Sequence, residues 1–495
     1  NWEKENDREF IFPWQIIPIY TEEKEVPDVI TRFLKNINAN VATIIQIKNI
    51  KETIQAVQNL SQEINMFLFL KNITEINFIM PEMITLEINR KEDGKITLTN
   101  GLTKTEWLIN TIILKIPSDV KNSLEDERNI PEKLLNTDSI ELSIAAKVGI
   151  DGIFKISKQE SLLYSYLPTS VTKYSLPVLV NTSFLTNSNR ESLHVDSKWN
   201  QWLFKEIAVE LFKWISKLVV TKFEFQAYQL IPNEVISDTL GKEFNDGIKD
   251  ALKNIPFVVS KNDQLIKIED AIVDFTYLSE KSFIGENSIK NFIYKNKTEE
   301  KSRKYFAKNC DFFSDLKRLG ASYFEWKNLQ EFLLSEYSNN VNTSFNNIEL
   351  IKHLKKVCDS KKIKEITIEE LRKLPFILDH KNKNTYPNQI CFPTANDQNW
   401  DNPNSELSFL HRDLQSWLIK DLESRHWLEC LGVVEKTDIT YITQNIIPNI
   451  DNYITQENGI QTILDLFSLY RQGNLKEDLI RKLSRLKLFT QNNAL

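Results

Sequence analysis

A chain of 495 residues is too long for a single hydrophobic core, and its length predicts two to four domains. The 62 Lys and Arg residues are outnumbered by 68 Asp and Glu, and a net charge of −6 argues against a polyanion-binding surface spread over the whole molecule. Glycine is scarce, with 11 in the chain. No two glycines stand closer than Gly149 and Gly152, which excludes both a dinucleotide-binding G-x-G-x-x-G loop and a Walker A loop.

Cysteine spacing and apolar run length bear on metal binding and on compartment. Cys310, Cys358, Cys391 and Cys430 are far apart and form no Cys-x-x-Cys pair, so we expect reduced thiols and no metal site. The longest apolar run, near residues 64–70, falls well short of the ~18 residues of a membrane span. The sequence therefore predicts a cytoplasmic protein without a membrane partner.

The first 185 residues combine one helical pattern with many strand-like ones. Residues 50–64 carry apolar side chains at helical spacing, and alternation on both sides of Glu92-Asp93-Gly94 predicts a hairpin over 83–98. The polar stretch 121–138 is typical of a surface loop. The strands from residue 140 onward predict a mixed sheet on which helices can pack. Strands besides the hairpin are predicted at 9–20, 41–47, 67–70, 76–79, 112–116, 140–146, 153–156 and 176–185.

A long helix is predicted after Asp196 or Ser197, because apolar residues recur there at three- and four-residue steps. Burial of this stripe at about 25 cal/mol per Å² contributes several kcal/mol, so we expect it to form core rather than a cofactor site. Its members are Trp199, Trp202, Leu203, Ile207, Leu211, Trp214, Ile215 and Leu218.

The segment 187–194, Asn-Ser-Asn-Arg-Glu-Ser-Leu-His, lies between the strand-like run 176–185 and this helix. One interpretation is structural: Ser188 and Glu191 have the spacing of a capping box that starts a helix. The other is functional, because it places Arg190 at a strand-to-helix junction, where a guanidinium can reach a phosphate.

The same segment resembles a motif of the middle domain of the ninety-kilodalton heat-shock chaperones, Asn-x-Ser-Arg-Glu-x-Leu-Gln, with Asn189 in place of the serine and His194 in place of the glutamine. The surrounding sequence is more similar to sacsin-type proteins. The similarity includes Leu-Tyr-Ser-Tyr-Leu-Pro at 163–168, Phe-Leu-Thr-Asn-Ser-Asn-Arg-Glu at 184–191, and Trp199-Asn200 at the start of the helix.

An internal duplication is visible without the resemblance. Ile-Pro-Phe-Val-Val-Ser at 255–260 recurs as Leu-Pro-Phe-Ile-Leu-Asp at 374–379, and Leu-Lys-Arg-Leu-Gly at 316–320 recurs as Leu-Glu-Cys-Leu-Gly at 428–432. Two signatures in the same order predict two copies of one α+β module. Each Pro-Phe pair should open a strand, and each Leu-Gly pair should end a helix.

The resemblance implies an α+β protein of the chaperone-type (Bergerat, or gyrase/histidine-kinase/chaperone) ATPase family. Residues 1–80 would be the end of a nucleotide-binding domain, 81–240 a mixed-sheet middle domain, and 241–345 and 346–495 two C-terminal modules. Arg190 would be catalytic and contact the ATP γ-phosphate, with Asn187, Asn189 and His194 beside the nucleotide. Since the acid-plus-asparagine helix of the family is not visible here, ATP and Mg²⁺ would be held by an upstream domain.

This interpretation implies an ATP-driven conformational clamp that acts on a protein client or partner subunit. The alternative is a non-enzymatic interaction scaffold. Nucleic acid is a secondary candidate for its partner, since lysines interleave with aromatic residues at 290–297 and 301–308 and cluster again at 352–364. A role in bacterial defence is compatible with this architecture, but no residue of the sequence supports it. Two short patterns imitate sites. His411-Arg-Asp-Leu resembles a kinase catalytic loop but lacks its companion motifs. His426 and Cys430 are one helical turn apart, a spacing that two ligands of one metal can have, but no further ligand pair is nearby in the sequence.

Overall fold

A computed structural model describes residues 26–37, 50–80, 83–101, 103–125, 132–234, 238–295, 303–360, 366–393, 408–435, 459–473 and 477–483, with a few single residues between these ranges. The predicted strand at 9–20 lies outside the described residues, and so does most of the one at 41–47.

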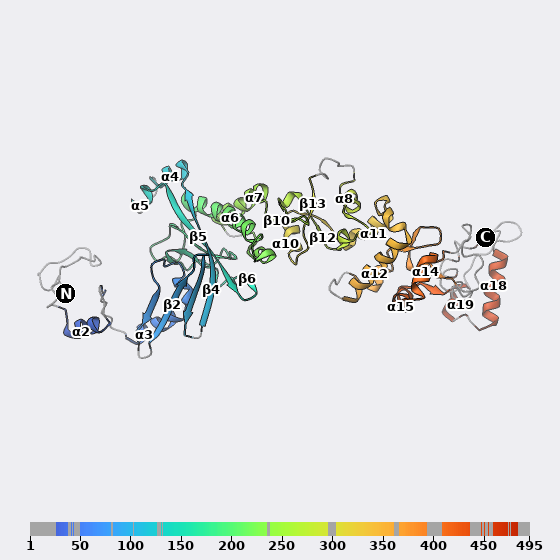
Figure 1. The fold of residues 1–495 in the computed structure, drawn as a ribbon, viewed down its shortest axis with the longest axis horizontal. Helices are drawn as coiled ribbons and strands as arrows, with labels where there is room; N and C mark the ends of the chain where they lie inside the picture. Colours follow the sequence, from blue (N-terminus) through green and yellow to red (C-terminus); the bar gives the residue numbers. More distant parts are fainter. Residues whose placement is uncertain are drawn as a thin grey trace.

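A nine-stranded sheet dominates the N-terminal half of the molecule (Figure 1). Its order is β1-β2-β3-β4-β5-β9-β7-β8, and β6 pairs with β5. The sheet is mixed, as predicted, because β7 and β9 run parallel while β4 and β5 form a long antiparallel ladder. The strands are β1 (Glu75–Phe78), β2 (Ile84–Arg90), β3 (Lys95–Asn100), β4 (Thr103–Lys115), β5 (Ser139–Gly149), β6 (Gly152–Phe154), β7 (Leu163–Ser165), β8 (Leu167–Pro168) and β9 (Leu179–Asn181).

Several local predictions in this half are confirmed. The helix expected over 50–64 is α3 (Ile50–Gln62), and the predicted hairpin is the antiparallel pair β2 and β3. The turn between these two strands needs Gly94, whose φ is 82°, a left-handed value that costs a residue with a Cβ more than it costs glycine.

Two other predictions in the same region are wrong. Residues 67–70 do not form a strand, because the 3₁₀ helix η2 (Ile64–Phe67) occupies their start and docks onto the sheet through Asn65. The side-chain oxygen of Asn65 accepts a hydrogen bond of 3.1 Å from the Trp107 indole. The polar stretch 121–138 overlaps α4 (Ser118–Glu125) and contains α5 (Glu132–Leu135), and Leu124 of α4 is buried although its neighbours in the sequence are polar.

The two faces of β5 pack against different elements. Ile140, Leu142, Ile144, Ala146 and Val148 share one core with α6 (Lys198–Leu218), as the two-residue period of a strand requires. Ala145 points the other way and belongs to a second core that includes Ile64 and Leu68. The sheet is therefore buried on both sides.

Helix α6 is the central element of this fold. Every apolar residue of its predicted stripe is buried, which confirms that the stripe is core. Helix α7 (Thr239–Asn254) packs against it at very short range, because a Cβ on Gly247 would lie 2.4 Å from the Lys205 carbonyl oxygen. The 3₁₀ helix η3 (Glu224–Leu230) contacts both α6 and β6, and its Gln226 side-chain oxygen accepts a hydrogen bond of 3.3 Å from the Ile153 N–H of β6.

The predicted duplication is present in the backbone. Strand β10 (Val258–Val259) pairs with β11 (Leu265–Ile266), and β15 (Ile377–Leu378) pairs with β16 (Asn384–Thr385), in one register repeated 119 residues later (258 to 377, 266 to 385). Phe257 and Phe376 directly precede these strands, and both are fully buried at 0% exposure. The expectation for the two Pro-Phe segments is confirmed.

The rest of each repeat also corresponds. In the first repeat, β12 (Ala271–Asp274) lies between β13 (Tyr305–Phe306) and β14 (Ser322–Phe324), all parallel. In the second, β17 (Cys391–Phe392) pairs in parallel with β18 (Val434–Glu435) and bridges Phe409. Helices α10 (Phe313–Arg318) and α15 (Leu422–Leu431) end near Gly320 and Gly432, whose φ values are 110° and 108°, so the Leu-Gly prediction is confirmed as well.

Continuous hydrophobic cores join the N-terminal sheet to the first repeat and the first repeat to the second. One core extends from Leu114 to Ala321, and a second extends from Ile272 to Val433 across both repeats. The β1–β2 ladder also crosses residue 80, and the domain boundaries given above stay a prediction. The remaining helices are α2 (Asp28–Asn36), η4 (Ile268–Asp270), η5 (Leu278–Glu280), α8 (Glu286–Tyr294), α11 (Trp326–Leu334), η6 (Glu336–Asn342), α12 (Ser344–Ser360), α13 (Ile368–Leu371), η7 (Pro387–Gln389), α14 (Arg412–Leu418), α18 (Gly459–Arg471) and α19 (Glu477–Leu483).

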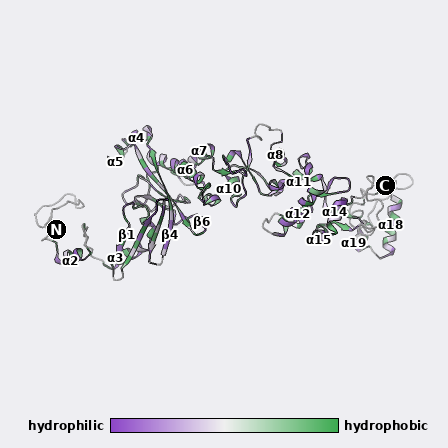
Figure 2. Cartoon of the chain, in the orientation of Figure 1, coloured by the Kyte–Doolittle hydropathy of each residue, from purple (hydrophilic) through white to green (hydrophobic). Residues whose placement is uncertain are grey.

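Figure 2 shows polar and apolar residues mixed along the labelled helices. Within the described ranges, no helix has the length and apolar character needed to cross a membrane.

The repeat core yields a stability prediction. Phe376→Ala removes a fully buried ring and should destabilise the protein by about 3–5 kcal/mol, measured as a lower midpoint of urea unfolding. Phe345→Ala is the matched control, because the Phe345 side chain on α12 is 72% exposed and its loss should leave the midpoint nearly unchanged. Equal effects of the two substitutions would contradict the assignment of Phe376 to the core.

Candidate functional site

The segment around Arg190 forms a tight turn on the connection between β9 and α6. A bridge between Thr186 and Leu193 closes the turn, and α6 begins only at Lys198. No helix begins at Ser188, so the capping-box interpretation of Ser188 and Glu191 is wrong. The backbone here instead reverses direction over a few residues, which presents the tip of the turn at the surface.

Asn187 builds the turn from within. Its carbonyl oxygen accepts a hydrogen bond of 3.1 Å from the Arg190 backbone N–H. Its side-chain oxygen accepts two more, of 2.9 Å from the Glu191 N–H and 3.1 Å from the Ser192 N–H. Asparagine commonly stabilises turns in this way. The Asn187 amide oxygen is thus occupied by the turn itself, and its role is to position Arg190.

Arg190 has a left-handed backbone conformation, with φ at 60°. Such a conformation in a residue with a Cβ costs of order 1–3 kcal/mol and persists only where surrounding contacts enforce it. One of these contacts is a hydrogen bond of 3.1 Å, which the Arg190 carbonyl oxygen accepts from the Ser170 N–H. The backbone of the arginine is fixed on both sides.

The guanidinium of Arg190 is held only lightly. Its Nη1 donates a hydrogen bond of 3.2 Å to the Ser165 carbonyl oxygen at the end of β7. The hydrogen bond to Ser165 is the contact of this guanidinium within the described part of the chain, where it forms no ion pair with a carboxylate. A guanidinium carries five N–H donors, so the described residues leave most of its hydrogen-bonding capacity unused.

The two other predicted nucleotide neighbours are exposed. The Asn189 side-chain nitrogen donates to the Glu191 carboxylate. His194 holds the loop through its backbone, because its N–H donates to the Leu185 carbonyl oxygen over 3.1 Å while its imidazole is exposed. The turn therefore brings all four predicted residues together, but only Arg190 presents a charged donor.

Asn200 is the functional residue whose role sequence reasoning missed. It is fully buried, at 0% exposure, in the first turn of α6. Its Oδ1 accepts a hydrogen bond of 3.0 Å from the Leu185 N–H, and its Nδ2 donates to the Leu185 and His194 carbonyl oxygens at 2.8 and 3.0 Å. This amide ties both ends of the turn to the helix. The available signal was an amide inside an otherwise apolar helical stripe.

The structure adds little support for two other candidate sites, the His426–Cys430 pair and the lysine cluster at 352–364. The Cys430 sulfur lies 3.8 Å from the His426 Nε2, and no group of three metal-ligating side chains occurs in the described part of the chain. In the lysine cluster at 352–364, Lys352 pairs with Glu349 and Lys355 with Asp359, each at 2.7 Å. These two lysines are thus paired with acids of their own helix.

Comparison of the chain with models of protein families, with curated proteins and with solved structures gave no match.

The hydrogen bonds of Asn200 to both ends of the turn yield a second prediction. Asn200→Ala leaves the buried Leu185 N–H without an acceptor, which should cost about 1–3 kcal/mol in unfolding free energy. Amide hydrogen exchange over residues 186–194 should accelerate at the same time. Gln201→Ala, which removes one hydrogen bond of 3.2 Å to the Val195 carbonyl oxygen, is the control and should leave exchange in the turn unchanged. Slow exchange of the turn in Asn200→Ala would contradict the role of Asn200 in holding the turn.

Proposed function

We propose that this chain is part of a sacsin-like, ATP-driven conformational clamp in which Arg190 senses the γ-phosphate of ATP. ATP and its Mg²⁺ are held by a chaperone-type ATPase domain upstream, and this chain supplies the arginine and the modules that contact a protein client or partner subunit. The observation that carries the proposal is the Arg190 turn, a fixed and strained backbone whose guanidinium has no carboxylate partner among the described residues.

The left-handed backbone of Arg190 costs free energy that the rest of the turn must offset. A positively charged side chain on a surface loop has no need of a left-handed backbone or of a buried amide clamp. Here the turn is fixed by Asn187 from within and by Asn200 from the helix below. Fixing the backbone that carries the donor in advance reduces the reorganisation needed when a charged ligand arrives, which is how electrostatic stabilisation becomes effective. The turn is suited to a phosphate oxygen in this respect.

Exposed apolar side chains near the N-terminal end of the described residues are consistent with contact to a further domain. Helix α2 buries none of its residues, and even its apolar side chains Val29 and Phe33 are 73% and 48% exposed. Helix α3, by contrast, packs Val57 and Leu60 against the second core of the sheet. Amphipathic helices are normally stabilised by packing of their apolar faces. In this proposal, the apolar face of α2 packs against the ATPase domain.

Closure of that domain onto Arg190 reaches the C-terminal modules through packed structure. The turn is bonded to α6, α6 packs on α7 at Gly247, and the core that contains both helices continues to Ala321 in the first repeat. A ligand shifts such an equilibrium by the difference of its affinities for the open and closed states. Arg190 provides that difference, because its guanidinium meets the phosphate only in the closed state.

The first functional prediction concerns Arg190 in a protein that includes the ATPase domain. Arg190→Ala should leave folding intact and lower ATP turnover strongly, since arginines in this role are worth roughly 10³–10⁵ in rate in the best cases. Ser188→Ala, an exposed change in the same turn, is the control. Unchanged turnover in folded Arg190→Ala would exclude the proposal and favour the scaffold, in which the turn has a purely structural role.

A further prediction concerns the 495-residue chain alone. Because it has no glycine-rich loop, and because the described residues include no metal-ligand cluster, calorimetric titration with ATP and magnesium should detect no binding tighter than about millimolar, roughly 4 kcal/mol. A micromolar dissociation constant would mean that the nucleotide site lies within this chain.

A further inference from the structure

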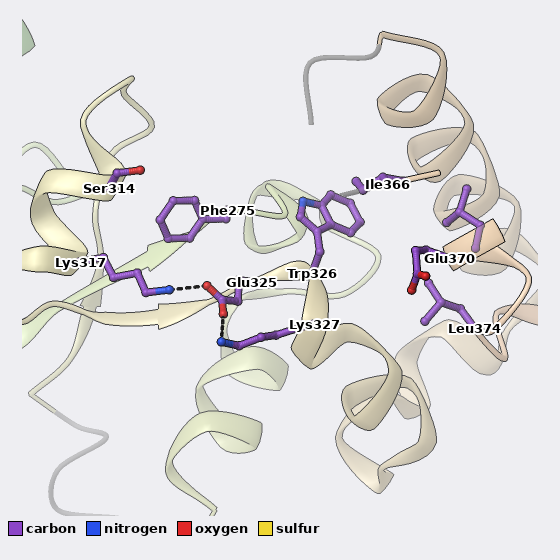
Figure 3. Close-up of a pocket in the computed structure, with 10 residues that line it drawn as sticks. Phe275, Ser314, Lys317, Glu325, Trp326, Lys327, Ile366, Glu370 and Leu374 are labelled. Carbon is purple, nitrogen blue, oxygen red and sulfur yellow. Dashed lines mark hydrogen bonds and ion pairs between the residues drawn. The ribbon is translucent and has the colours of Figure 1, made fainter. Parts of the chain in front are cut away.

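A cavity of about 630 Å³ lies where the first repeat meets the segment that leads into the second (Figure 3). Its volume falls within the range of about 300–1,000 Å³ found for small-molecule sites. The apolar wall consists of two rings from the first repeat and three aliphatic side chains from the following segment. These residues are Phe275, Trp326, Ile366, Leu371 and Leu374.

One rim of the cavity carries more positive than negative charge. The ammonium groups of Lys317 and Lys327 both bind the carboxylate of Glu325, and Figure 3 shows them converging on it from two sides. Although burial raises the pKa of Glu325, hydrogen bonds from the two lysines outweigh this effect and hold the pKa below its ordinary value. The rim therefore holds two ammonium groups and one ionised carboxylate.

Lys317 is also oriented by an aromatic ring, since its Nζ lies 3.9 Å from the centroid of the Tyr323 ring. On the opposite wall, the Glu370 carboxylate pairs with Lys373 at 2.6 Å. Trp326 adds an indole N–H that is shielded from solvent and has no acceptor among the described residues. The acids of this cavity are thus already paired, and the unused hydrogen-bonding capacity belongs to donors.

We propose that this cavity binds a small amphipathic carboxylate, with an aromatic ring or a branched aliphatic chain as its apolar body. The body covers Phe275, Trp326 and the aliphatic wall, and the carboxylate accepts hydrogen bonds from Lys317 and Lys327. Such charge-assisted hydrogen bonds are about twice as strong as neutral ones. The second repeat lacks an equivalent of this site. In the alignment of Leu-Lys-Arg-Leu-Gly with Leu-Glu-Cys-Leu-Gly, Glu429 takes the position of Lys317. Glu429 pairs with Arg425 at 3.2 Å.

The test compares 3-phenylpropionate with its neutral isostere 3-phenylpropanamide by ligand-observed NMR titration of the full chain. The carboxylate should bind in the millimolar range or tighter and at least about tenfold better than the amide. Lys317→Met should abolish that preference. Lys352→Met is the matched control, because Lys352 also pairs with a glutamate and lies over an aromatic ring, that of Trp417, outside the cavity.

A second variant tests the location without removing a charge. Ser314 lines the cavity from an exposed position on α10, so Ser314→Tyr should block the cavity and abolish binding while the unfolding midpoint stays unchanged. Absence of carboxylate binding, equal affinity for carboxylate and amide, or full binding by Ser314→Tyr would each overturn the proposal.

Discussion

The hydrogen bonds of Asn200 in the buried first turn of α6 are the constraint on which the rest of the structure depends. This amide joins the end of the strand-like run at Leu185, the carbonyl of His194 and the helix itself. The neighbouring Trp199 indole donates a further hydrogen bond of 2.8 Å to the Ser183 carbonyl oxygen. Because α6 also packs on the sheet and on α7, one helix fixes the turn, the sheet and the start of the repeats relative to one another.

This arrangement explains how a loop can hold the backbone of a charged residue, Arg190, in one position. Loops that serve as binding sites are usually positioned by a rigid scaffold, and here the scaffold is a helix that is buried nearly all round. The left-handed backbone of Arg190 and its hydrogen bond to the Ser165 carbonyl then set the direction of the side chain. The same reasoning separates Arg190 from Lys352 and Lys355 of α12, which pair with acids of their own helix.

Periodicity and repetition predicted the elements that are governed by burial, namely α3, the β2–β3 hairpin, α6 and the paired repeats. In the repeats, Phe257 and Phe376 could be matched because both are buried and both precede a hairpin of the same register. Sequence reasoning failed where tertiary contacts decide. Residues 67–70 have strand propensity, yet η2 is formed because Asn65 bonds to the sheet. Ser188 and Glu191 fit a helix cap, yet the Asn187 side chain closes a turn there instead.

In the proposed clamp, the Arg190 turn meets the γ-phosphate of a nucleotide held by another domain. This contact can be tested by photo-cross-linking with an ATP analogue that carries an aryl azide on its γ-phosphate, in a protein that contains the ATPase domain, followed by peptide mapping. We expect a cross-link within residues 186–194 that excess ATP suppresses. Labelling confined to the ATPase domain, with none in this turn, would rule the contact out.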